Sequence, residues 1–231
     1  SWYSNEVTGV TRIMQAQSLD IGGDEDLQHM VSHTPSITFG YYDSMNETQT
    51  SYQVQVSTLS DYSSADLWDS GEVTSSDTSV TYAGTTLADG VTYYLRAKVG
   101  SGAFYSDWST LTFRMNSTIS MEDLSFDPDL GETSVYTEGF PTVSSSPTDS
   151  EGDSVFVYYM LSDNAGFSPL VDSALVYFDP SGADVSWQPI VDPLDNQQYW
   201  IKAKGYDGYE YGNESNTYSF MTNSENDAPA A

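Results

Sequence analysis

The sequence predicts an all-β protein built from two tandem antiparallel β-sandwich domains. Apolar and polar residues alternate with a period of two, which is typical of half-buried strands. Turn signals such as DSG, ADG, GSG and DPSG interrupt these stretches at short intervals. Three sequence blocks also recur in one order about 106 residues apart, which indicates a tandem duplication.

The first element, SWYSNEV, matches a closing strand found one repeat later. Trp2 and Val7 lie 106 residues before Trp108 and Phe113 of the segment DWSTLTF. We expect an extended strand, with Trp2, Ser4 and Val7 on it, at an edge of another repeat or of another molecule. The alternative is that this strand extends an edge of the first domain.

The repeat sets the expected domain organisation. The first domain covers residues 18–116 and the second covers residues 117–223. A strand or linker at 1–17 precedes them, and a linker or tail at 224–231 follows. In each domain, alternate residues of one strand face the core, as Val54 does, while their neighbours, such as Gln55, face outward.

The recurring blocks define the strands of each domain. They pair SYQVQVSTLSDYSSADLWDSG (51–71) with FVYYMLSDNAGFSPLVDSA (156–174), TLADGVTYYLRAKV (86–99) with PLDNQQYWIKAKG (193–205), and DWSTLTF (107–113) with ESNTYSF (214–220). In these blocks the chain resembles fibronectin type III-like modules of bacteria and archaea. The resemblance implies two immunoglobulin-like sandwiches, each with a tyrosine corner, at Leu87/Tyr93 and Leu194/Tyr199. It implies little about function, because such modules serve many roles.

Composition excludes several classes of partner. Six basic residues against 34 acidic ones give a net charge of −28, so nucleic acid and anionic membrane surfaces would be repelled. There is no cysteine and no apolar run long enough to cross a bilayer. An acidic surface fits saline or extracellular surroundings, although it also serves plain solubility. The sequons at Asn46, Asn116 and Asn213 fit glycosylation or chance equally well.

No catalytic motif is present, and we expect no enzyme activity. The two histidines, His29 and His33, have the i, i+4 spacing of a helical metal site, but the sequence around them does not predict a helix. Neither a nucleophile motif nor a glycine-rich phosphate loop is found.

Calcium is the cofactor that the sequence suggests. Asp149, Glu151 and Asp153 alternate in the segment DSEGD, and carboxylate oxygens are the ligands that Ca²⁺ prefers. The competing interpretation is an acidic turn in an acidic protein.

The outer face of the second domain is a candidate contact patch formed by Tyr158, Met160, Trp200 and Lys202. Four of the six basic residues also fall on one strand of each repeat, namely Arg96, Lys98, Lys202 and Lys204. These cations could pair with an acidic neighbour or with groups of their own domain.

Together these features favour a structural or adhesive segment of a microbial surface protein, surface layer or extracellular filament. Its expected partners are other copies or adjacent repeats of the same protein, and glycans, with no nucleic acid and no membrane insertion. The alternative is a carbohydrate-binding accessory region of a secreted polysaccharide-active enzyme. Both place the protein outside the cell or on its surface.

Overall fold

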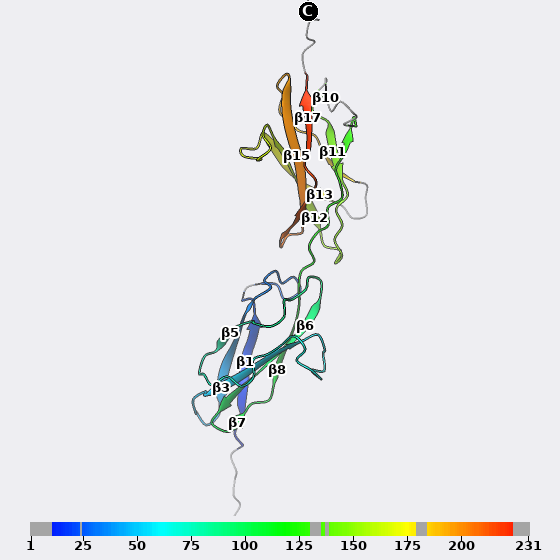
Figure 1. Ribbon diagram of the computed structural model, residues 1–231. Coiled ribbons are helices and arrows are strands. Elements are labelled where there is room, and N and C mark those ends of the chain that lie inside the picture. The colour runs from blue at the N-terminus through cyan, green and yellow to red at the C-terminus, as the bar shows by residue number, and fades with distance from the viewer. Residues whose placement is uncertain (1–10, 24, 130–134, 137–138, 179–183, 224–231) are drawn as a thin grey trace, which may run out of the picture. The chain divides into compact units, whose positions relative to one another are not determined.

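The computed structural model describes residues 11–23, 25–129, 135–136, 139–178 and 184–223. The chain divides into two compact units, Ser1–Asn116 and Ser117–Ala231, which are described one at a time (Figure 1). Within the described residues there are strands and no helix, so the predicted fold class is confirmed. In that part of the chain, accordingly, no helix is long and apolar enough to cross a membrane.

The first unit packs two antiparallel sheets face to face. One sheet has the order β1-β2-β5, with strands β1 (Met14–Ile21), β2 (Ser36–Asp43) and β5 (Ser79–Thr81). The other has the order β4-β3-β6-β7, with β8 also paired to β6; its strands are β3 (Ser51–Ser57), β4 (Trp68–Asp69), β6 (Thr92–Ser101), β7 (Phe104–Tyr105) and β8 (Ser109–Arg114).

The core of the first unit lies where the predicted alternation places it. Val54, Leu95 and Phe113 are fully buried between the two sheets. Gln55, on the opposite face of β3, pairs with Arg96 on β6. Alternation therefore decides which side chains fill the core, because successive residues of a strand point to opposite faces.

The second unit repeats this plan. Its smaller sheet has the order β14-β11-β9, with strands β9 (Ser125–Asp127), β11 (Thr142–Ser145) and β14 (Val185–Trp187). Its larger sheet has the order β10-β17-β15-β12-β13, with β16 paired to β15; its strands are β10 (Val135–Tyr136), β12 (Val155–Ser162), β13 (Asp172–Phe178), β15 (Gln197–Tyr206), β16 (Tyr211–Glu214) and β17 (Tyr218–Thr222).

A buried tyrosine distinguishes the core of the second unit. Tyr159 is completely buried, donates a hydrogen bond to the carbonyl of Val185 (2.7 Å) and lies 2.8 Å from the hydroxyl of Ser145. Its ring stacks on Trp187 at 5.7 Å between centroids. The hydroxyl is therefore satisfied inside an apolar core, as a buried polar group must be.

Both units have a tyrosine corner, with one correction to the predicted residues. The hydroxyl of Tyr93 accepts a hydrogen bond from the amide of Ala88 (2.7 Å), and that of Tyr199 accepts one from the amide of Leu194 (3.0 Å). Leu194 is thus the counterpart of Ala88, and its side chain is 64% exposed whereas Leu87 is buried. The predicted pairing of Leu87 with Leu194 was wrong by one residue, because the hydroxyl anchors the backbone five positions before each tyrosine.

Serine side chains close the strand edges in a recurring arrangement that we call the serine bracket. In each case the serine amide donates to a strand carbonyl while its hydroxyl accepts the amide hydrogen of the same strand residue. The hydroxyl then donates to the carbonyl of the residue that follows the serine. The brackets join Ser70 to Val54, Ser106 to Val99 and Ser215 to Ala203.

Candidate contact surfaces

Four aromatic side chains form a line across the outer face of the larger sheet of the second unit. Phe156 on β12 lies opposite Tyr177 on β13 and Tyr206 on β15, and Tyr206 lies opposite Tyr211 on β16. Ring centroids are 5.4 Å apart for Phe156 and Tyr177 and 4.7 Å apart for Tyr206 and Tyr211. We call these four residues the aromatic row. They point away from the core, because their neighbour Val157 is fully buried on the other face.

The adjacent line of side chains widens this surface. Tyr158 on β12 lies opposite Leu175 on β13 and Lys204 on β15. The ammonium of Lys204 is 3.9 Å from the ring centroid of Tyr211 and 6.0 Å from that of Tyr158. Tyr177, Leu175 and Tyr211 remain about half exposed, at 52%, 50% and 48%. The result is a contiguous apolar surface with one cation, the kind of patch that marks a contact site.

The predicted contact patch lies on this face, with one error. Tyr158, Trp200 and Lys202 belong to the outer side of β12 and β15 and are partly buried. Met160, in contrast, is only 7% exposed, so its predicted exposure was wrong. The physical reason is that β12 lies between β13 and β15, whose side chains flank Met160 on both sides.

Sequence reasoning missed all four residues of the aromatic row. Tyr177 and Tyr211 enter it only through the pairing of β13 with β12 and of β16 with β15. The available signal was the alternation in SALVYF and the tyrosines of YDGYEYG, which mark strands beside the predicted patch.

The basic residues of the first unit pair within their own sheet. The guanidinium carbon of Arg96 lies 4.5 Å from the ring centroid of Tyr62 and 4.4 Å from that of Trp108. The ammonium of Lys98 lies 4.8 Å from the Trp108 centroid and 4.9 Å from the Tyr105 centroid. Trp108 thus covers both cations.

In the second unit, Lys202 forms an ion pair with Glu214 (2.6 Å) and lies over the ring of Phe167 at 4.5 Å. Of the two predicted pairings for the basic residues, these contacts and those of the first unit favour the local one.

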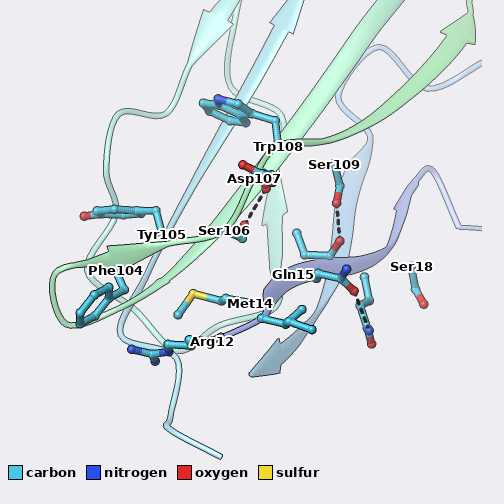
Figure 2. Close-up of a pocket in the computed structure, with 13 residues that line it drawn as sticks. Arg12, Met14, Gln15, Ser18, Phe104, Tyr105, Ser106, Asp107, Trp108 and Ser109 are labelled. Atoms are coloured by element: carbon cyan, nitrogen blue, oxygen red, sulfur yellow. Dashed lines mark hydrogen bonds between the residues drawn. The ribbon is translucent and has the colours of Figure 1, made fainter. Parts of the chain in front are cut away.

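A groove runs along one edge of the first unit, with a volume of about 820 Å³ (Figure 2). Residues 12–18 of the β1 region line one side and residues 104–109, which lead into β8, line the other. We call it the edge groove. Arg12 closes one end, where its guanidinium pairs with the carboxylate of Asp43 and lies 4.9 Å from the ring centroid of Phe104.

Several hydrogen bonds hold the Arg12–Asp43 ion pair at the end of the groove. Asp43 accepts hydrogen bonds from Arg12, the amide of Met45 (2.9 Å) and the hydroxyl of Tyr41 (3.2 Å). Chiefly because of the Arg12 guanidinium, the pKa of Asp43 falls to about 2. Arg12 is thereby fixed where β1 begins.

The acidic loop predicted to bind calcium has internal partners. Oδ1 of Asp149 accepts hydrogen bonds from the amides of Glu151 (2.7 Å), Gly152 (2.8 Å) and Asp153 (3.3 Å). Oε2 of Glu151 accepts one from the amide of Ser117 (2.6 Å). Among the described residues no group of three or more histidines and acids is arranged to hold a metal ion. Calcium binding stays a prediction.

The two histidines contact different carboxylates. Nδ1 of His29 is 3.2 Å from the carboxylate of Asp26, and Nε2 of His33 is 2.8 Å from that of Asp89. The predicted donated strand, with Trp2, Ser4 and Val7, lies outside the described residues.

Comparison with known proteins agrees with the fold. Residues 17–117 match the sequence model of the N-terminal immunoglobulin domain of Rha78A-like proteins. That match and the strand order of both units confirm the predicted immunoglobulin-like, fibronectin type III-like sandwiches. No curated protein has significant sequence similarity to the chain.

Solved structures with similar folds include tandem modules and enzymes. The FN1–FN3 domains of chicken CNTN1 align with 12% identity and a TM-score of 0.47, covering 90% of this chain and 67% of that one. A two-domain fibronectin type III segment of chicken tenascin aligns with 19% identity and a TM-score of 0.33, covering 89% and 97%. The alpha-L-rhamnosidase of Streptomyces avermitilis, complexed with L-rhamnose, aligns with 18% identity and a TM-score of 0.40, covering 94% of this chain. The chain spans 26% of that enzyme's length.

Proposed function

We propose that the chain is a non-catalytic, adhesive segment of an extracellular protein and that its second unit binds neutral carbohydrate. The observation that carries this proposal is the aromatic row, Tyr177–Phe156–Tyr206–Tyr211, on the outer face of the larger sheet, where Tyr177 and Tyr211 are exposed and the two rings between them partly so. The tandem repeat and the acidic composition support the proposal that such a segment belongs to a surface protein, surface layer or filament.

The row has the dimensions and chemistry of a saccharide platform. Neighbouring strands lie about 4.8 Å apart, so four strands present rings over roughly 14 Å. Aromatic faces pack against the apolar C–H faces of sugar rings, while tyrosine hydroxyls supply donors and acceptors at the ring edges. Tyr177 and Tyr211, at the two ends, are the more exposed members and would make the first contacts.

Charge narrows the ligand class. With a net charge of −28, the protein repels nucleic acids and polyanionic glycans at low salt. A neutral polysaccharide carries no such penalty. Lys204, beside Tyr211 and Tyr158, adds a hydrogen-bond donor next to the row.

A second setting is supported by the family match. The matched domain is described as N-terminal in Rha78A-like proteins, which is the position of an accessory module in a longer chain. The same carbohydrate contact would then serve a polysaccharide-active enzyme. The sequence that flanks this chain in its gene distinguishes the settings: further repeats or a wall anchor support the first, and a catalytic domain supports the second.

The experiment compares the intact chain with Tyr177→Ala/Tyr211→Ala. Affinity electrophoresis in gels containing neutral plant or bacterial polysaccharides measures binding. We expect retardation of the intact chain in at least one gel and at least a tenfold weaker affinity for the double variant, with an unchanged melting temperature. Tyr42→Ala removes a similarly exposed tyrosine from the first unit and should bind normally. Equal retardation of all three proteins, or none in any gel, would contradict the proposal.

A further inference from the structure

We propose that the edge groove of the first unit receives residues 1–10 of a second copy of this chain as an added strand. The proposal concerns the first unit and does not rest on carbohydrate binding by the second.

The acceptor is the outer edge of β1. In the sheet order β1-β2-β5 this strand has a neighbour on one side, and within the described residues it pairs with β2 alone among the strands. The amide and carbonyl of Ile13 bond to Ser44 at the end of β2, with distances of 2.9 Å. Backbone groups alternate in direction along a strand, so those of Met14 and Ala16 point toward the groove.

A contact across the groove agrees with this direction. The hydroxyl of Ser109, at the start of β8, donates a hydrogen bond to the carbonyl of Ala16 (Figure 2). The remaining groove-side groups of β1 form an edge that an extended peptide can pair with, as in strand addition to an open sheet.

The groove has two exposed apolar side chains among mostly polar lining residues. Phe104 is 62% exposed and Ile13 is about half exposed, and both line the groove with Met14. Side chains at alternate positions of an added strand would pack on these groups, and the others would face solvent. Burial of Phe104 and Ile13 would supply most of the binding free energy, since backbone pairing alone contributes little in water.

The N-terminal segment has the sequence of such a strand. In SWYSNEVTGV, Trp2 and Val7 repeat the spacing of Trp108, just before β8, and Phe113 in β8, the strand that closes the first unit. Its one charged side chain is Glu6, whereas the whole chain has 34 acidic residues. This segment can therefore approach another acidic copy of the protein with little electrostatic repulsion.

The occupant is a second copy because the first unit already has its closing strand. β8 pairs with β6 along six residues, and Phe113 on it is fully buried. A further strand of the same pattern therefore has no place on that side of its own sandwich. Among the described residues the open edge is that of β1, and because residues 1–10 lead into β1 of their own chain, the proposed acceptor is β1 of another molecule.

The test measures self-association by sedimentation velocity over a range of concentrations at low and high salt. We expect the full chain to associate reversibly, and more strongly at high salt, because salt screens the repulsion between two acidic proteins. Deletion of residues 1–10 should leave a monomer with an unchanged melting temperature. Phe104→Asp should weaken association at least tenfold, while Leu59→Asp, a matched change of an exposed apolar side chain outside the groove, should not.

Mixing the two defective proteins gives the sharpest result. The Phe104→Asp chain keeps its donor segment and the deleted chain keeps its groove, so together they should form one-to-one dimers and nothing larger. A labelled peptide of residues 1–10 should bind the deleted chain and compete with this dimer. Ile13→Asp provides a second groove variant if Phe104→Asp folds poorly.

Three outcomes would overturn the proposal. One is a full chain that stays monomeric at every concentration and salt level. Another is association that survives the deletion. The third is a deleted chain that remains monomeric but melts at a lower temperature, which would place the segment on its own first unit.

Discussion

The outer faces of the two units differ although their strands correspond. In the first unit Trp108 lies over Arg96 and Lys98, so aromatic and cationic groups of the sheet satisfy one another. In the second unit the residue five positions before the buried phenylalanine of the closing strand is Ser215, and Glu214 lies opposite Lys204, the counterpart of Lys98. Ser215 forms a bracket with Ala203 and covers no ring.

The consequence is a change of surface rather than of fold. Among the described residues no indole lies over β15, and in the aromatic row of the second unit Tyr177 and Tyr211 are about half exposed. The comparison teaches that the same strand framework can cover its basic residues with different side chains, Trp108 in the first unit and Phe167 and Tyr211 in the second.

The largest expected effect tests how differently the two cores are built. Tyr159 and Val54 occupy equivalent positions, each opposite an alanine, Ala203 or Ala97. Tyr159→Ala should lower the free energy of unfolding of the second unit by about 3–5 kcal/mol, because a large buried ring is lost. Val54→Ala should lower that of the first unit by less. Urea unfolding followed by two-dimensional NMR assigns each transition; equal losses would refute the difference.

A smaller effect should follow from removing the indole that covers the cations. Trp108→Leu keeps an apolar side chain but loses the contacts with Arg96 and Lys98, each of which contributes about 0.5–1 kcal/mol. We expect the first unit to lose roughly 1–2 kcal/mol and the second none. A drop in the second transition, or no change in the first, would contradict this account of the closed face.

The next difference between the units should appear in the pH dependence of their stability. The pKa of Asp43 is about 2 in the folded first unit, below the value of about 3.9 for an unfolded chain. The Arg12–Asp43 pair therefore stabilises this unit fully above roughly pH 4, and this contribution is lost as the pH falls toward 2. Thermal melts from pH 5 to about pH 2 should show it, and Asp43→Asn should remove that part of the pH dependence.

The smallest effect concerns calcium and the second unit. If Asp149, Glu151 and Asp153 bind Ca²⁺, an ion concentration ten times Kd adds about 1.4 kcal/mol to stability. The melting temperature of the second unit should rise with Ca²⁺ and fall back with EDTA, and Glu151→Gln should reduce the rise. An equal response to Mg²⁺ would indicate charge screening instead, and no response would remove the prediction.

Sequence patterns predicted the sandwiches because strand alternation and turn residues act locally. Val54, Tyr93 and Phe113 could be placed in the core from the period of two alone. The aromatic row was not predicted, because Tyr177 and Tyr211 reach Phe156 and Tyr206 only through strand pairing. The burial of Met160 depends on the same pairing.

The role of Trp108 likewise could not be predicted from the sequence. Its contacts with Arg96 and Lys98 require the register of β8 against β6, which no local pattern specifies. The calcium motif shows the reverse limit: its alternating acids also suit a turn in which Asp149 holds three backbone amides.

The serine brackets have a consequence for how such a module can change in evolution. At Ser70, Ser106 and Ser215 a hydroxyl accepts the strand amide that a peptide carbonyl would otherwise have to accept. Each bracket thus spans a short break in pairing without leaving the strand amide unpaired, and the chain pairs again with the same strand at Val73, Ser109 or Tyr218. Insertions directly after these three residues should be tolerated, so loops of new length and specificity can be grafted there while the sandwich stays intact.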